Sequence, residues 1–246
     1  MPPRGPLRRQ AEGGSEQLTS MVPENRVWRI GFRADPRAWS GWEWATNGRF
    51  PGRWDDLHGN FRTVYARTSL EACLLEVLAG FRRDARLAAE LDEIVEDDED
   101  AVLHPTVPRG QVPREWLDAR AATSASLAGA YWAVTESASV AALYPYFIGM
   151  ALSLGLADFD AAALKDPRPR ELTQAIAAWI YENADFDGVT FASRHGDDLR
   201  LWAIFERPGD GLVSPKLQHR RSEDLHHDSD AIRHAFRMLG LSWKSE

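Results

Sequence analysis

The chain has 246 residues, of which 44% are hydrophobic, and a formal net charge of −8. This length and composition are enough to bury a sizeable core in one domain, which excludes a disordered chain. The acidic balance argues against nonspecific binding of nucleic acids or anionic membranes over the whole surface. We therefore expect no direct nucleic-acid or membrane partner.

Several motifs that would assign a function are absent from the sequence. No stretch approaches the roughly 20 apolar residues of a membrane helix, and no secretory or twin-arginine signal is recognisable. G-x-G-x-x-G, P-loop and G-x-S-x-G motifs are also missing, which disfavours a Rossmann dehydrogenase, a nucleoside triphosphatase and an α/β hydrolase. The single cysteine, Cys73, cannot form an internal disulfide, which is typical of a reducing compartment. We therefore expect a cytoplasmic protein.

The first predicted strand follows a tail without hydrophobic periodicity. Residues 1–22 are rich in Pro, Gly, Arg, Glu and Ser, which predicts disorder. Residues 23–246 are expected to form a single domain. Alternation over residues 27–33 predicts a strand that carries Arg29 on the face opposite its large apolar side chains.

Three tryptophans follow in the next loop, at Trp39, Trp42 and Trp44. Their rings are large enough to wall an adenine or nicotinamide ring, but they are equally suited to fill a core or a lid. Packing in the core or in a lid is the favoured interpretation.

Residues 48–83 combine a basic loop, a short strand and a helix. The strand is expected over residues 62–66, with Tyr65 on the face opposite its smaller apolar residues. Thr68 and Glu71 form a T-x-x-E capping box, which predicts the start of the helix. Apolar side chains then recur at helical spacing and predict a core-facing stripe. The stripe consists of Leu70, Leu74, Val77, Leu78 and Phe81.

Glu76 lies at the edge of this stripe, among small side chains. The residues three and four positions away are Ala72, Cys73, Ala79 and Gly80, and none of them can pair with a carboxylate. Two interpretations stay open on these residues alone. Glu76 is either a solvated surface glutamate or a carboxylate beside an open site.

The loop before the strand is basic, although the whole chain is acidic. Between Trp28 and Arg67 there are seven arginines and four acids, a net positive charge of three. Guanidinium groups bind phosphate and carboxylate oxygens with two parallel hydrogen bonds. A basic patch beside one carboxylate suggests a ligand that has an anionic part and a part where positive charge develops. A nicotinamide dinucleotide fits this pattern, because it has a diphosphate and a glycosidic carbon that becomes an oxocarbenium ion.

The remaining sequence predicts further helices and strands. The expected helices cover residues 85–94, 112–120, 139–154, 170–183 and 229–239, with a turn or short helix ended by prolines before the fourth. The expected strands cover residues 126–134, 188–193 and 199–205, and a hairpin turn over residues 194–198 joins the last two.

Five motifs in this order resemble the RES-domain family, bacterial proteins best known as toxins of Xre–RES toxin–antitoxin pairs. The matching residues are Arg29 in VWRIG, Arg53 in GRW, Tyr65 in VYA, Glu76 in LLEVL and Ser193 in FASRHG. The resemblance extends from about residue 28 to residue 206, and the ordered set is far more specific than any single motif.

The resemblance implies an α+β fold. We expect a small, bent, mixed or antiparallel sheet with flanking helices, similar to that of ADP-ribosyltransferases. Glu76 and Ser193 are 117 positions apart, which is more than in compact members of the family, so a helical insertion is expected at about residues 85–185.

The resemblance also implies degradation of NAD+, by phosphorolysis or hydrolysis, with release of nicotinamide. Arg29 and Arg53 would hold the diphosphate or an attacking phosphate, and Tyr65 would stack on the nicotinamide or its ribose. Ser193 would bond the ribose, and Glu76 would stabilise the oxocarbenium charge. NAD+ is then the substrate and inorganic phosphate a co-substrate of phosphorolysis, with no required cofactor and no metal.

The family further implies a partner, an Xre-like helix-turn-helix antitoxin. Two alternative functions stay open. One is transfer of ADP-ribose to a macromolecular target from the same pocket. The other is a non-catalytic module that binds a nucleotide or an antitoxin.

Overall fold

The computed structural model describes residues 26–82 and 110–245, so the expected tail and the start of the expected insertion lie outside the described residues. The strands are β1 (Val27–Phe32), β2 (Thr63–Arg67), β3 (Gln111–Val112), β4 (Arg120–Leu127), β5 (Tyr131–Ala133), β6 (Gly188–Ser193), β7 (Gly196–Phe205), β8 (Leu217–Glu223) and β9 (Ser242–Trp243). The α-helices are α1 (Leu70–Leu78), α4 (Arg114–Asp118), α5 (Ser137–Ser153), α6 (Ala161–Lys165), α7 (Arg170–Asn183) and α8 (Asp230–Leu239). Two 3-10 turns, η1 (Trp42–Trp44) and η2 (Ala79–Phe81), complete the set.

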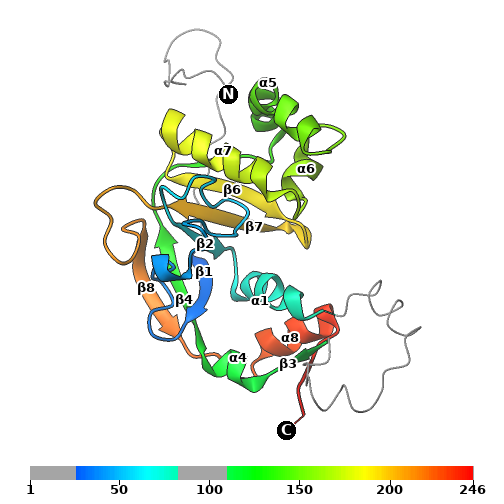
Figure 1. Cartoon of the computed structure of the whole chain (residues 1–246). Helices are drawn as coiled ribbons and strands as arrows, with labels where there is room; N and C mark the ends of the chain where they lie inside the picture. The colour runs from blue at the N-terminus through cyan, green and yellow to red at the C-terminus, as the bar shows by residue number, and fades with distance from the viewer. Residues whose placement is uncertain (1–25, 83–109, 246) are drawn as a thin grey trace, which may run out of the picture.

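A seven-stranded mixed sheet with the order β5-β6-β7-β2-β1-β4-β8 forms the centre of the fold. β5 and β6 are parallel, and the other neighbours are antiparallel. β1 and β2 meet at a single registered pair, Trp28 opposite Arg67. Figure 1 shows β6 and β7 running across the view whereas β4 and β8 run along it, so the sheet bends sharply near this junction. The α+β class and the bent mixed sheet predicted from the sequence are confirmed.

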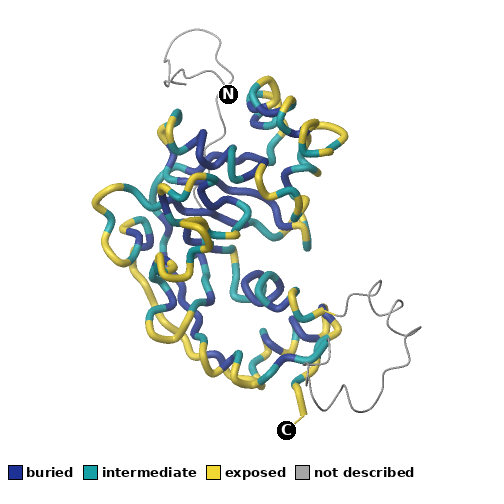
Figure 2. The backbone as a smooth tube through the Cα atoms, in the orientation of Figure 1, coloured by how far each residue is buried: buried dark blue, intermediate teal, exposed yellow. Residues whose placement is uncertain are grey.

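One face of the sheet carries two separate groups of helices. α5 and α7 cover β6 and β7 and form a cluster that we call the α7 core, whose members include Trp132, Leu143, Phe147, Ile176 and Phe191. α1 and α8 cover β1 and β4 and form the α1 core, whose members include Ile30, Leu74, Leu78, Ile232 and Phe236. Figures 1 and 2 show the two groups on either side of β2, each with a buried interior.

The alternation of β2 decides which side chains enter this face. Val64 and Ala66 are fully buried on the opposite face, in a third cluster with Trp39. Tyr65 packs against the α7 core, and Arg67 lies on the same side because it is two residues further along the strand. The predicted alternation is therefore confirmed.

α8 completes the α1 core. Its apolar side chains Ile232, Phe236 and Leu239 are buried against those of α1. At the rim, His234 Nε2 lies 2.8 Å from Glu71 Oε1 of α1. The helix begins after the cap Ser229 and ends at Gly240, which has the left-handed conformation that favours glycine.

Three local predictions are wrong. The N-cap of α1 is Ser69, whose hydroxyl accepts the Ala72 N–H at 3.0 Å, so the T-x-x-E box is one residue out of register. The strand predicted over residues 126–134 is two strands, β4 and β5, because the chain turns between them. The β6–β7 hairpin turn is shorter than predicted, since Ser193 already pairs with Gly196.

Two predictions about the longer segments also need correction. The described part of residues 85–185 contains the expected helices α5, α6 and α7, but it also supplies β4 and β5 to the main sheet. β8 was not predicted, because its side chains beyond Leu217 are exposed on both faces and show no alternation (Figure 2). Within the described ranges, no helix has the length and apolar character needed to cross a membrane.

The capping assignment gives a direct test by mutation. Ser69→Ala removes the acceptor for a backbone N–H in the first turn of α1 and should lower the free energy of unfolding by about 1 kcal/mol. Thr68→Ala removes the neighbouring hydroxyl and should change it by less than about 0.5 kcal/mol. Urea denaturation of both variants measures the difference. A larger loss for Thr68→Ala would restore the predicted capping box.

Candidate functional site

A short hydrogen bond joins α1 to the end of β6. The Ser193 hydroxyl donates to Glu76 Oε1 at 2.5 Å, and the same Ser193 oxygen accepts the His195 N–H at 2.9 Å. Ser193 is buried, whereas Glu76 is partly exposed at the edge of α1. The structure therefore brings together two predicted site residues that are 117 positions apart.

The strands explain why Ser193 faces α1. Phe191 lies in the α7 core, and Ser193 follows it by two residues on the same face of β6. The β6–β7 register is irregular between Ala192 and Ser193, so the hairpin closes directly after Ser193. The hydroxyl is thus held at the end of a strand by a tight turn.

Arg53 lies on a loop whose backbone is fixed by buried polar groups. Asp55 is 5% exposed, and its carboxylate accepts the Gly52 N–H at 2.5 Å and the Tyr65 hydroxyl at 3.0 Å. The Tyr65 oxygen in turn accepts the Trp54 N–H at 2.9 Å. A Cβ atom at Gly52 would lie 2.4 Å from Asp55 Oδ2 and 2.6 Å from the Tyr65 oxygen, so only glycine fits there.

Burial raises the pKa values of both Asp55 and Tyr65. Burial raises the pKa of Asp55, although the Gly52 N–H and the Tyr65 hydroxyl act in the opposite direction. Burial, with the nearby charge of Asp55, raises the pKa of Tyr65 well above its usual value. Tyr65 is therefore a neutral phenol whose hydroxyl holds the loop, while its ring packs against the α7 core.

α7 anchors the same loop from the other side. The Gln174 side-chain amide donates to the Phe50 carbonyl at 3.2 Å and to the Gly52 carbonyl at 2.9 Å. The Arg170 guanidinium donates to the Pro51 carbonyl. Three consecutive carbonyls before Arg53 are thus bound by one helix, which leaves the loop little freedom to move.

The charges of Arg53 and Glu76 act on each other. Burial lowers the pKa of Arg53, and the Glu76 carboxylate opposes this shift, while Arg194 and Arg170 add repulsion. Burial also lowers the pKa of His195, with Glu76 again opposing the shift, so this imidazole is neutral at neutral pH. Arg53 is thus within electrostatic reach of one carboxylate and of two further guanidinium groups.

Arg29 is not joined to this cluster by a direct contact. Its guanidinium donates to the Pro36 carbonyl at 2.7 Å and to the Ala38 carbonyl at 3.2 Å. Burial and the nearby charge of Arg67 lower the pKa of Arg29 to about 10. The chain after β1 folds back so closely that a Cβ at Gly31 would lie 2.5 Å from the Pro36 oxygen. Arg29 therefore holds this loop, on the face of β1 opposite α1.

The three tryptophans have different environments. Trp39 is buried, and its indole N–H donates to the Gly211 carbonyl at 3.0 Å, as the packing interpretation predicts. Trp42 is 42% exposed and lies against Phe50 of the Arg53 loop, with the ring centroids 5.3 Å apart. Trp44 is exposed. Only Trp42 is thus close to the loop that carries Arg53.

Cys73 and the histidines give no sign of redox or metal chemistry in the described residues. Cys73 is buried one turn before Glu76, and burial raises the pKa of its thiol to about 11. The thiol is therefore neutral and is a poor nucleophile at neutral pH. Residues 26–82 and 110–245 contain no cluster of three or more His, Cys, Asp or Glu side chains that could hold a metal ion.

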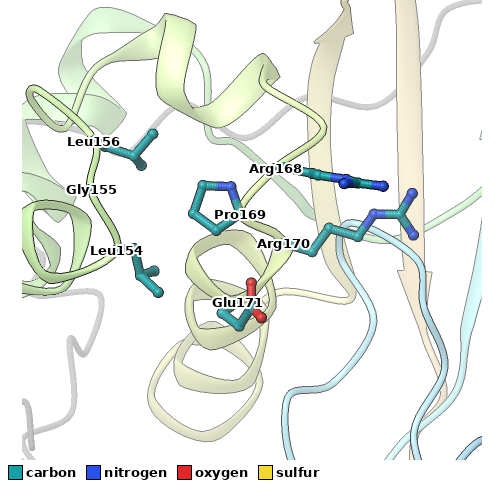
Figure 3. Close-up of a pocket in the computed structure, with 7 residues that line it drawn as sticks. All are labelled: Leu154, Gly155, Leu156, Arg168, Pro169, Arg170 and Glu171. Carbon is teal, nitrogen blue, oxygen red and sulfur yellow. The ribbon is translucent and has the colours of Figure 1, made fainter. Parts of the chain in front are cut away.

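An open pocket of about 760 Å³ lies between the end of α5 and the start of α7 (Figure 3). Leu154 and Leu156 line one side, and Arg168, Arg170 and Glu171 line the other. It contains none of the predicted site residues. Its relation to the site is through Arg170, which also binds the Arg53 loop.

A family model for the RES domain matches residues 26–228, most of the chain and all five motif residues. The chain belongs to the RES-domain family. This family is associated with toxin activity directed at NAD+. No curated protein and no solved structure gives a match, so the similarity to ADP-ribosyltransferases stays a prediction.

The RES motifs did not reveal every polar residue of the site. Asp55 follows the GRW motif directly, and its burial could have been suspected only from the packing of Tyr65. Gln174 lies on a helix 122 positions away from Gly52, and no local pattern indicates the contact. Arg67 shares a strand face with Tyr65, which the period of two along a strand does indicate.

Gln174 can be tested without knowing the reaction. Gln174→Leu removes two hydrogen bonds to the loop, each worth about 0.5–1.5 kcal/mol, so local opening should become about tenfold or more frequent. Limited trypsin digestion under native conditions measures this opening as cleavage after Arg49 and Arg53. Glu182→Leu, on the exposed side of the same helix, is the control. Equal cleavage rates in the two variants would mean that Gln174 does not hold the loop.

Proposed function

We propose that this protein cleaves the bond between nicotinamide and ribose in NAD+, by phosphorolysis or hydrolysis. The observation that carries the proposal is the Glu76 carboxylate, which is held by Ser193 and lies within electrostatic reach of Arg53. Membership of the RES-domain family supports the same substrate.

Glu76 supplies what this reaction needs most. As the glycosidic bond breaks, its electron pair moves to the nicotinamide nitrogen, which becomes neutral, and positive charge develops on the ribose carbon and ring oxygen. A fixed carboxylate beside that carbon stabilises the charge without having to reorganise. The hydrogen bond from Ser193 fixes the carboxylate in this way, so Ser193 acts first as the residue that positions Glu76.

Arg53 is our choice for the contact with the anionic part of the substrate. Its loop is held by Asp55 and Gln174, so the guanidinium is presented from a rigid backbone. Arg29 is less suitable for this role, because two backbone carbonyls already accept hydrogen bonds from its guanidinium. Tyr65 contributes through the loop rather than through a free hydroxyl.

The second half of the reaction consumes a nucleophile. A phosphate oxygen that attacks the ribose carbon gives ADP-ribose 1″-phosphate, and a water molecule gives ADP-ribose and a proton. The basic surroundings of Glu76 favour a phosphate dianion near the ribose over a neutral nucleophile, which supports phosphorolysis.

Nicotinamide release from NAD+ tests this function. The purified chain should release nicotinamide, and Glu76→Ala should lower the rate at least about a hundredfold with the fold intact, because the oxocarbenium charge loses its stabilising carboxylate. Glu71→Ala, a carboxylate on the same helix that pairs with His234, should keep the rate. The assay is run with and without inorganic phosphate, and the product mass distinguishes phosphorolysis from hydrolysis.

The outcome separates two mechanisms. A rate that falls to background without phosphate identifies a phosphorylase, and a phosphate-independent rate identifies a glycohydrolase. Near-full activity of Glu76→Ala would remove Glu76 from the mechanism. If the wild-type chain releases no nicotinamide, the proposed function is wrong.

The cellular role follows from the reaction. We propose that the protein acts as a toxin that depletes NAD+ and that an Xre-like helix-turn-helix antitoxin restrains it, as the family suggests. Expression of the wild-type chain in bacteria should lower NAD+ and stop growth, whereas Glu76→Ala should do neither. Co-expression of a helix-turn-helix protein encoded beside it should restore both. Normal growth with unchanged NAD+ would contradict the toxin role.

A further inference from the structure

Arg67 carries a buried cationic atom without a hydrogen-bond partner. Its Nε is buried, and it is the one charged donor among the unpartnered buried side-chain atoms of the described residues. No ion pair involves Arg67 in that part of the chain. A buried charge normally has a partner, because removing an ion from water is costly, so this side chain calls for an explanation.

The two groups that act on Arg67, the Cys73 thiol and the Arg29 guanidinium, supply no compensating negative charge. The guanidinium interacts with the Cys73 thiol, but burial raises the pKa of that thiol to about 11, so it is neutral. Arg29 is also a cation, and its repulsion with Arg67 contributes to the lowered pKa of Arg29. The two guanidinium groups therefore repel each other, and the Nε of Arg67 has no hydrogen-bond acceptor in the described residues.

Arg67 lies on the face of the sheet that carries the candidate site. It follows Tyr65 by two residues on β2, and it is opposite Leu201, which is itself opposite Phe191 of β6. Ser193 follows Phe191 by two residues at the end of β6. On α1, Cys73 interacts with both Arg67 and Glu76. Arg67 and Glu76 are thus both within electrostatic reach of one small thiol.

We propose that Arg67 is an anion-binding residue of this site and takes a phosphate group beside Glu76. A phosphate oxygen would give the unpartnered guanidinium Nε an acceptor in a charge-assisted hydrogen bond. That the anion is a phosphate rests on the proposed function. The phosphate is either inorganic phosphate or the diphosphate of the dinucleotide, and the two sources share the same chemistry.

The experiment measures binding separately from catalysis. Inorganic phosphate and ADP-ribose are titrated in turn into the full chain by calorimetry, at constant ionic strength maintained with sodium chloride. The chain is compared with Arg67→Met, Arg67→Lys and Arg33→Gln. Arg33→Gln is the control, because Arg33 is an exposed arginine that pairs with Asp224.

We expect Arg67→Met to weaken binding of one probe or both at least about tenfold, the range for a lost charged hydrogen bond. Arg67→Lys should retain part of the affinity, since it keeps the charge but not the planar fork. Arg33→Gln should bind like the wild type. A loss confined to inorganic phosphate assigns Arg67 to the nucleophile, and a loss for ADP-ribose assigns it to the diphosphate.

Arg67→Met should also melt no earlier than the wild type in phosphate-free buffer, because it removes an unpaired buried charge. Should this variant fail to fold, the comparison rests on Arg67→Lys. The proposal is overturned if the wild type binds neither probe, or if both Arg67 variants bind both probes as the wild type does. Phosphate binding that depends on Arg67, in a chain that releases no nicotinamide, supports the anion site and contradicts only the proposed function. Nicotinamide release together with binding that does not depend on Arg67 supports the proposed function and contradicts the anion site.

Discussion

The hydrogen bond between Ser193 and Glu76 can form only if two separate cores are in place. Glu76 belongs to α1, whose position depends on the α1 core, and Ser193 belongs to β6, whose position depends on the α7 core. The two cores lie on one face of the sheet, on either side of β2. The bond at 2.5 Å is therefore a sensitive indicator of how the two halves of the molecule fit together.

The loop that carries Arg53 is also held by contacts from separate parts of the chain. One buried carboxylate, one phenol and one amide fix four backbone groups between Phe50 and Asp55, and no side chain larger than hydrogen fits at Gly52. These groups are costly to bury and are satisfied by one another. If this loop binds the substrate, as we propose, its order in advance favours affinity and rate, because a flexible loop would first have to be ordered.

Sequence reasoning was most successful where the information is local. The helix over residues 170–183 and the strand over residues 188–193 match α7 and β6, because period and turn residues define both. The motif residues Arg53, Tyr65, Glu76 and Ser193 lie in one region of the fold, as the family pattern suggests. Arg29 does not contact them, because its hydrogen bonds depend on how the following loop folds back, which no local pattern encodes. The contacts of Gln174 and the polar edge strand β8 could not be predicted from the sequence either, because no local pattern encodes them.

The family match ends at residue 228, but the folding unit does not. Ile232, Phe236 and Leu239 of α8 lie beyond that limit and bury the outer side of α1, the helix that carries Glu76. A chain cut at the family boundary would leave Leu74 and Leu78 in contact with water and α1 supported on one side only. α8 contains no motif residue, but it packs against the helix that carries the Glu76 carboxylate and supports its position.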